Sequence, residues 1–148
     1  MAQRAKFIPM KQQQRTLTIA TNGQGLYEFT REANAFVKTS GIAVGQLTLY
    51  CRHTSASLVI QENADPDVLR DLKEFFRRIV PDDSPWIVHR IEGPDDMPAH
   101  IKTALTHTSL SVPVTQGKLA LGTWQGIFLF EHRSAAHRRD VVLHVTGE

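Results

Sequence analysis

The chain has one cysteine among 148 residues, Cys51, so no disulfide can form within it. A single free thiol is typical of a reducing compartment, and we expect the protein to be cytoplasmic. It also lacks any run of about 20 apolar residues, the length that crosses a bilayer as a helix. The N-terminal MAQRAKFIPMKQQQR contains no apolar core of signal-peptide length. These absences argue against a membrane protein and against a disulfide-stabilised secreted domain.

A strong excess of one charge is also missing. The 17 lysine and arginine residues nearly balance 15 acidic ones, and a net charge of +2 is too small for a general nucleic-acid binder. With 41% hydrophobic and 22% charged residues, the chain is long enough to bury one core. No linker or low-complexity stretch divides it. The sequence therefore predicts a single domain over residues 1–148, with residues 1–14 as a loosely ordered extension.

Strand-like alternation of apolar and polar residues recurs along the chain. It occurs in residues 11–20, 26–30, 45–52, 55–61, 109–122, 127–133 and 140–147. The Asn22-Gly23 step favours a hairpin turn between the first two of these segments. Strands interleaved with a few helices predict an α+β domain with largely antiparallel, sandwich-like sheets.

Three helices are predicted among these strands. Thr30 can cap the first, which ends at Gly41, a residue suited to a left-handed C-terminal position. Asp65 and Pro66 have the cap and first-turn chemistry of the second helix. Its apolar residues form one stripe: Val68, Leu69, Leu72, Phe75, Phe76 and Ile79. The third helix is expected to begin near Pro98. Its predicted inward residues are Ile101, Ala104 and Leu105.

Histidines provide the candidate metal ligands. Neutral imidazole is the commonest side-chain ligand of zinc-like ions, and an open site needs three protein ligands plus water. His53, His89 and His100 are the three candidates, although the spacing of His89 and His100 matches no closed zinc-finger pattern. For each histidine taken singly, a hydrogen-bonded structural role is the alternative. The expected cofactor is a divalent ion, zinc-like at the histidines, with magnesium as the alternative for a pyrophosphate substrate.

The segment LGTWQGIFLFEHR at 121–133 looks buried and yet ends in three ionisable residues. In a strand, His132 would follow Phe128 and Phe130 on one face, while Glu131 would follow the other apolar row. A charge that continues an apolar row costs free energy unless it is paired or bound to a ligand. The alternative is that the strand simply reaches solvent at Glu131.

Hydroxyl groups beside His53 suit an anion. Thr54 and Ser55 offer hydroxyls and turn amides that can donate to a phosphate. The sequence has no P-loop, dinucleotide fingerprint, H-E-x-x-H motif or nucleophile elbow. Nucleotide-driven and standard hydrolase chemistry are therefore not indicated.

Three long segments occur in a characteristic order and spacing: HTSASLVIQENADPDV, EGPDDMPAHIKTAL and GKLALGTWQGIFLFEHR. They resemble the YjbQ family, and the resemblance covers the chain from about residue 15 onward. It implies a compact α+β sandwich-like domain, a homotrimer, and a metal and anion site near the subunit boundary. It also implies a secondary thiamine-phosphate synthase activity.

The resemblance can be carried over residue by residue. The family's H-T-T-A-like motif falls on residues 53–56, where Ser55 keeps the hydroxyl of the second threonine. The A-H-I-K motif places His100 at the start of the helix near Pro98. The E-G motif is matched loosely, with one residue more than expected between His89 and Glu92. Glu131 matches the end of the G-T-W-Q-G strand, whereas family members often carry phenylalanine at position 132, so the resemblance favours Glu131 as the functional charge.

The implied reaction joins a pyrimidine pyrophosphate to a thiazole phosphate, with release of pyrophosphate. Such a reaction needs the departing pyrophosphate neutralised by a divalent ion and basic groups. Thr54, Ser55 and Arg133 are the candidate phosphate contacts. One alternative is a non-catalytic module that binds a metal and a small phosphorylated metabolite. The other is a metal-dependent hydrolase with Glu62 or Glu131 as its base. No nucleic acid or membrane is expected as a partner.

Overall fold

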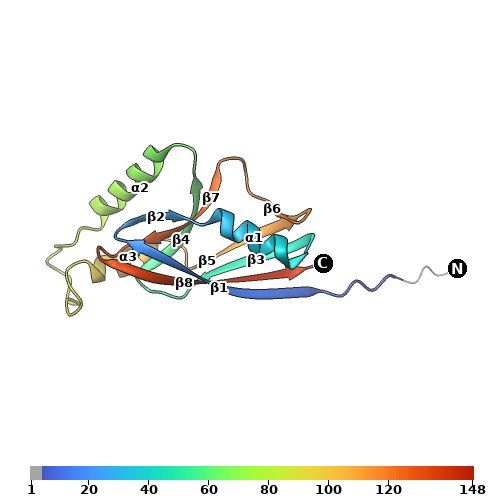
Figure 1. Cartoon of the computed structure of the whole chain (residues 1–148). Coiled ribbons are helices and arrows are strands. Elements are labelled where there is room, and N and C mark those ends of the chain that lie inside the picture. Colours follow the sequence, from blue (N-terminus) through green and yellow to red (C-terminus); the bar gives the residue numbers. More distant parts are fainter. Residues whose placement is uncertain (1–4) are drawn as a thin grey trace.

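The computed structural model describes residues 5–148, which form two antiparallel sheets and three helices (Figure 1). The larger sheet has the strand order β1-β8-β3-β5-β6, and the smaller has the order β2-β7-β4. The strands are β1 (Lys11–Asn22), β2 (Gly25–Glu28), β3 (Val44–Cys51), β4 (Ala56–Glu62), β5 (Ser109–Thr115), β6 (Lys118–Leu119), β7 (Gln125–Glu131) and β8 (Ala136–Gly147). This architecture confirms the expected α+β class with antiparallel, sandwich-like sheets.

The turn after β1 does not close a hairpin. β1 pairs with β8 in the larger sheet, whereas β2 pairs with β7 in the smaller one. Gly23 has a φ of +95°, and a Cβ there would lie 3.1 Å from the carbonyl oxygen of Ser134. The predicted hairpin was therefore wrong, because alternation identifies strands without identifying their partners. The turn instead carries the chain from one sheet to the other.

β1 begins at Lys11, where the strand predicted over residues 11–20 begins, and it includes four residues that were also assigned to the N-terminal extension. It pairs with β8 along its whole length, from Lys11 opposite Gly147 to Asn22 opposite Ala136. Residues 11–14 are therefore part of the larger sheet and not of a loose extension. Residues 5–10 are exposed and have no regular secondary structure.

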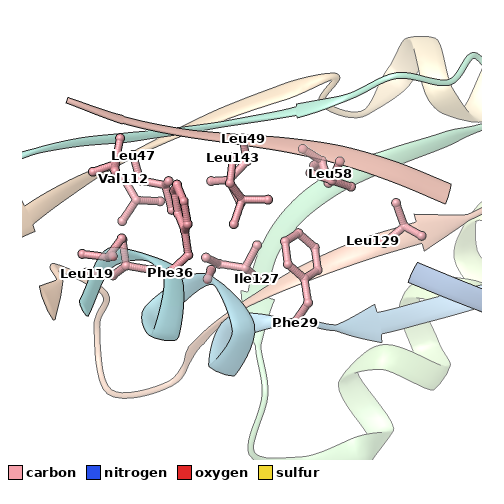
Figure 2. Close-up of a cluster of buried hydrophobic side chains, with 14 of the residues drawn as sticks. Phe29, Phe36, Leu47, Leu49, Leu58, Val112, Leu119, Ile127, Leu129 and Leu143 are labelled. Carbon is pink, nitrogen blue, oxygen red and sulfur yellow. The ribbon is translucent and has the colours of Figure 1, made fainter. Parts of the chain in front are cut away.

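The hydrophobic core lies between the two sheets. Figure 2 shows Phe36 and Ile127 pointing toward Leu49 and Leu143 of the larger sheet. Phe36 belongs to α1 (Thr30–Ser40), which ends at Gly41 with a left-handed φ of 71° as predicted. The hydroxyl of Thr30 donates to Glu28 instead of capping the helix. β7 is the middle strand of the smaller sheet and contributes its inward residues to this core.

The second helix, α2 (Pro66–Ile79), begins as predicted, since the Asp65 side chain accepts the N–H of Asp67 at 2.9 Å. Its apolar stripe, however, is not buried anywhere along the helix. Phe75 and Ile79 are about half exposed, and Phe76 meets Phe130 of β7 edge to face, with 5.2 Å between ring centroids. α2 therefore rests on the outer side of the smaller sheet through part of its stripe only (Figure 1).

The third helix, α3 (Asp96–Leu105), begins at Asp96, two residues before Pro98. Proline is tolerated in this first turn because its missing N–H would have no helical partner there. The predicted inward face was wrong: Lys102 and Thr103 are buried, while Leu105 is exposed. No helix in residues 5–148 is long and apolar enough to cross a membrane.

Candidate metal centre and adjoining cleft

Four possible ligands meet beside α3. Asp96 and His100 lie four residues apart on this helix, a spacing that places them on the same side. His89 and Glu92 come from the loop between α2 and α3. One ligand atom of each residue lies within 4.8 Å of all the others. We call these four residues the metal-ligand group.

Asp96 is the centre of the group. Its buried carboxylate places Oδ2 at 2.7 Å from His89 Nε2 and at 3.0 Å from His100 Nε2. The other oxygen, Oδ1, accepts from the guanidinium of Arg133 at 2.8 Å. Arg133 also donates to Asp95 Oδ2 and to the carbonyl of Glu92, at 3.0 Å each. Arg133, which the sequence assigned to phosphate, therefore holds the acidic residues of the group in place.

The hydrogen bonds of His100 determine which ring nitrogen can bind a metal. Its Nδ1 lies 2.7 Å from the carbonyl oxygen of Thr54, which can only accept, so Nδ1 carries the proton. In the neutral ring, Nε2 then presents an electron pair to the carboxylate of Asp96. Two electron pairs that face each other require a cation between them, either a proton or a metal ion. Two imidazoles with carboxylates form a donor set that zinc and related divalent ions accept, and a carbonyl that fixes the ring is typical of metal-binding histidines.

Electrostatics keep Asp96 ionised. Burial alone would raise the pKa of this carboxyl, but the hydrogen bond with His89 and the nearby charge of Arg133 lower the pKa below its usual range. A metal ligand must be deprotonated, so the lowered pKa favours cation binding. The side chains of His89 and His100 are 41% and 29% exposed, which leaves the group open on one side.

A cleft of about 690 Å³ adjoins the group. Its lining residues come from the end of β3, the following loop, α3, the segment between α3 and β5, and β8: Tyr50, Cys51, Arg52, His53, Thr54, Ser55, His100, Thr103, Ala104, Thr108 and Arg139. His100 belongs both to this lining and to the metal-ligand group. A ligand in the cleft would therefore lie next to a bound ion.

His53 lines this cleft but lies outside the metal-ligand group. Its Nε2 accepts the backbone N–H of Asp140 at 2.7 Å. Burial lowers the pKa of His53, and the nearby Arg139 lowers it further. The structure thus brings His89 and His100 together and supplies Asp96 in place of His53. Sequence reasoning missed Asp96, although its four-residue spacing from His100 was a usable signal.

The two predicted phosphate contacts of the H-T-S-A segment also line the cleft. Thr54 uses its backbone carbonyl to orient His100. Ser55 is buried, and its hydroxyl accepts from Arg139 at 3.0 Å. Both residues therefore shape the wall of the cleft beside the metal-ligand group.

The two predicted catalytic carboxylates lie elsewhere. Glu131 is 0% exposed, and Arg139 binds both of its oxygens, at 2.8 and 2.6 Å. Burial would raise the pKa of Glu131, but Arg139 and the hydroxyl of Thr21 lower it. Glu62 is the last residue of β4, whereas the first residue of this strand, Ala56, lies beside the cleft. The six residues between the two ends correspond to about 20 Å of extended strand. Its side chain accepts the N–H of Asp65 before α2, so neither carboxylate is placed to act at the metal-ligand group.

Glu131 and His132 are both buried, so the strand formed by LGTWQGIFLFEHR does not reach solvent at Glu131. β7 has the larger sheet on one side and α2 and α3 on the other, so neither face is free. His132 Nε2 lies 2.9 Å from the hydroxyl of Ser57, and its buried Nδ1 has no partner in residues 5–148. Burial lowers the pKa of His132 to about 3, helped by the charge of Lys102.

The family profile described as "UPF0047 protein YjbQ-like" matches residues 15–148. A UPF0047 protein of Synechocystis is 54% identical over 93% of this chain and 94% of its own length. The UPF0047 protein YjbQ of Escherichia coli O157:H7 is 43% identical over 91% of this chain and 98% of its own length.

Solved structures agree with the sequence comparison. A YbjQ-like protein from Sulfolobus solfataricus superimposes with a TM-score of 0.87 at 25% identity, covering 95% of this chain and all of the other. A YjbQ/UPF0047 family protein from Clostridium acetobutylicum gives 0.77 at 34% identity, over 87% and 96% of the two chains. The sequence profile, the sequence relatives and the fold all agree, and the chain belongs to the YjbQ-like UPF0047 family.

Proposed function

We propose that the chain is a metal-assisted transferase that acts on phosphorylated thiamine precursors. The observation that carries the proposal is the position of the metal-ligand group at the edge of a 690 Å³ cleft, with His100 shared by both. Clefts of this size accept small metabolites. The choice of reaction, a thiamine-phosphate synthase activity that releases pyrophosphate, comes from the family resemblance.

His89, Asp96 and His100 are the proposed ligands, and Glu92 is available as a fourth. A divalent ion held there would supply positive charge to a departing pyrophosphate. We assign Arg133 to positioning, because its donors are engaged by Asp95, Asp96 and Glu92.

The protein groups proposed for substrate binding line the cleft. Arg52 is exposed there and takes over the role of basic phosphate contact that the sequence gave to Arg133. His53, with Nε2 occupied by a backbone donor, can offer its Nδ1–H to a substrate oxygen. Thr54 and the backbone of Ser55 complete the wall. The site needs little proton transfer from protein, since positioning and charge neutralisation dominate such reactions.

A non-catalytic module that binds a metal and a phosphorylated metabolite is the second candidate. It needs only the metal-ligand group and the adjoining cleft, and it requires no general base from Glu131, which is bound by Arg139, or from Glu62, which is remote. The same placements make the metal-dependent hydrolase the weakest of the three alternatives, because both of its candidate bases lie away from the group.

One experiment separates these candidates. Metal-loaded protein would be incubated with the pyrimidine pyrophosphate and the thiazole phosphate, while pyrophosphate release and thiamine phosphate are measured. We expect both products from the wild type, none from His100→Ala, and wild-type yield from the exposed control His107→Ala. Metal binding and metabolite binding without product would support the non-catalytic module, and release of inorganic phosphate from one precursor alone would support the hydrolase.

We also propose that the protein is a cytoplasmic homotrimer, as the family resemblance implies. The loop that carries His89 exposes three large apolar side chains, Trp86, Val88 and Ile91, and Val88 is 92% exposed. A subunit contact would remove these side chains, and the half-exposed Phe75 and Ile79 of α2, from water. Light scattering should return about three times the chain mass of 16.6 kDa. A monomer mass over a wide concentration range would contradict this proposal.

A further inference from the structure

Arg139 of β8 is buried, with 5% of its surface exposed, and yet it lines the 690 Å³ cleft. Its Nε and Nη2 atoms donate to the two carboxylate oxygens of Glu131, at 2.8 and 2.6 Å. Nη2 also donates to the hydroxyl and the carbonyl of Ser55, at 3.0 and 3.3 Å. The two N–H groups of Nη1 have no acceptor in residues 5–148. The protein therefore uses one side of the planar guanidinium and leaves the other side free.

Nη1 is not sealed inside the protein. The buried side-chain nitrogen and oxygen atoms that lack a partner in the described part of the chain are Thr103 Oγ1 and His132 Nδ1. Since Nη1 is not among them, it is within reach of solvent, and the cleft is the space that Arg139 borders. Arg139 therefore presents two unused N–H donors to the cleft.

The cleft has the charge pattern of an anion site. Its lining residues include two arginines, Arg52 and Arg139, and no aspartate or glutamate. His53 adds a further donor, because its Nε2 accepts the N–H of Asp140 and the ring proton is therefore on Nδ1. The bonds to Glu131 and Ser55 fix the guanidinium before a ligand arrives, which reduces the entropy lost on binding.

We propose that Arg139 is a substrate-binding residue that donates through Nη1 to the phosphate of the thiazole phosphate. This inference rests on the proposed function, in which both substrates are phosphorylated. The departing pyrophosphate is the group that needs a divalent ion. The single phosphate of the other substrate then needs donors from the protein, and a guanidinium matches two phosphate oxygens at once.

The direct test uses metal-free wild-type protein and methyl phosphate, a simple phosphate monoester. ¹⁵N NMR of the arginine guanidinium groups would follow Arg139, whose signals are assigned by their loss in Arg139→Lys. We expect methyl phosphate to shift the Nη signals of Arg139 without any added metal. Unchanged signals of Arg139, whether methyl phosphate binds elsewhere or does not bind, would overturn the proposal.

Variants provide the second part of the test. Arg139→Lys keeps a positive charge for Glu131 but loses Nη1, so we expect folded protein that binds methyl phosphate at least roughly tenfold more weakly. The matched control is Arg138→Lys at the neighbouring exposed position, which should bind like the wild type. Wild-type affinity in Arg139→Lys, with a loss in Arg52→Gln alone, would overturn the proposal. If Arg139→Lys does not fold, the shifts in the wild type decide.

This outcome can be separated from that of the proposed reaction. Methyl phosphate that binds at Arg139 in a protein that makes no thiamine phosphate would contradict the transferase and support Arg139 as a phosphate contact. Thiamine phosphate made by Arg139→Lys with an unchanged KM for the thiazole phosphate would support the transferase and overturn the role of Arg139. We expect an active wild type and a KM for the thiazole phosphate that rises at least about tenfold in Arg139→Lys.

Discussion

Arg139 of β8 and Glu131 of β7 form a buried ion pair that joins the two sheets across the end of the core. The guanidinium binds one carboxylate oxygen at 2.8 Å and the other at 2.6 Å. Thr21 of β1 donates to the same carboxylate at 2.6 Å. Three strands from two sheets therefore meet at one acidic side chain, which is a structural role.

Glu131→Gln should destabilise the protein, because it leaves the charge of Arg139 buried without a partner. Loss of one member of a buried pair costs about 3–5 kcal/mol, and we expect the lower end since glutamine keeps one acceptor. Urea denaturation measures the free energy of unfolding. The control Glu62→Gln should change it by less than about 0.5 kcal/mol, as for other surface positions. Metal affinity should be unchanged in folded Glu131→Gln protein. A loss of metal affinity would show that Glu131 contributes to the metal site.

His132→Phe should be close to neutral at pH 7. The substitution removes the buried Nδ1 that lacks a partner, and Ser57 keeps the hydrogen bond from Thr106 at 2.6 Å. Phenylalanine is somewhat larger, so we expect a change within about 1 kcal/mol in the free energy of unfolding. A loss of several kcal/mol would show that the bond between His132 and Ser57 is essential.

The same variant should alter the response to acid. The folded pKa of His132 is about 3, below the 6.5 of the unfolded chain, so between these values only the unfolded state takes up the proton. Stability from this group is complete above pH 6.5 and is lost as the pH falls toward 3. The slope is at most about 1.4 kcal/mol per pH unit. Denaturation from pH 7 to 4 should show a steeper loss in the wild type than in His132→Phe, and equal slopes would contradict the prediction.

Metal affinity should depend on His89, Asp96 and His100 but not on His53. Replacing any of the three by alanine should weaken zinc binding by at least about tenfold, since each would supply a ligand atom. His53→Ala should keep the wild-type affinity, because this residue lies outside the group. Competition with a fluorescent zinc chelator measures the change. Equal zinc binding by wild type and His89→Ala/His100→Ala protein would show that these histidines are structural.

Arg133→Gln should weaken zinc binding by roughly 10- to 100-fold without removing a ligand, as expected for residues that orient metal ligands. The variant loses the donors that fix Asp95 and Asp96. Arg133→Lys should recover part of the affinity, because lysine restores the charge but cannot donate to Asp95 and Asp96 in the planar geometry of a guanidinium. If Arg133→Gln binds zinc normally yet loses affinity for phosphate, the original assignment of Arg133 to phosphate holds.

The sequence was sufficient to predict elements whose signals are local. Asp65 and Pro66 marked the start of α2, and Gly41 marked the end of α1, because cap chemistry depends on a few adjacent residues. The choice of strand partners was not local, and the Asn22-Gly23 turn therefore gave a false hairpin. Of the four residues in the metal-ligand group, the sequence predicted His89 and His100 as ligands but not Glu92 and Asp96.

The remaining differences arise from side chains that break the rule of apolar inside and polar outside. Lys102 and Glu131 are buried, while Leu105 of the same helix as Lys102 is exposed. Hydrophobic periodicity assigned Leu105 to the inside of α3 and gave Lys102 no place there, whereas it did place Glu131 in line with an apolar row. Only the tertiary structure shows that Glu131 meets Arg139 and that Lys102 borders a cavity.

The pairing of β1 with β8 determines when the larger sheet can form during synthesis of the chain. Among residues 5–148, β1 is an edge strand that pairs with β8 alone, and β8 is synthesised after the other strands of this part of the chain. While the ribosome is still translating the middle of the chain, β1 has no strand to pair with, and Glu131 will lack Arg139 even when β7 is complete. Contacts between distant parts of a sequence slow folding, and unpaired strands promote aggregation. A nascent chain halted before β8 should therefore remain protease-sensitive at both β1 and β7, and should acquire protection in one step once β8 has emerged.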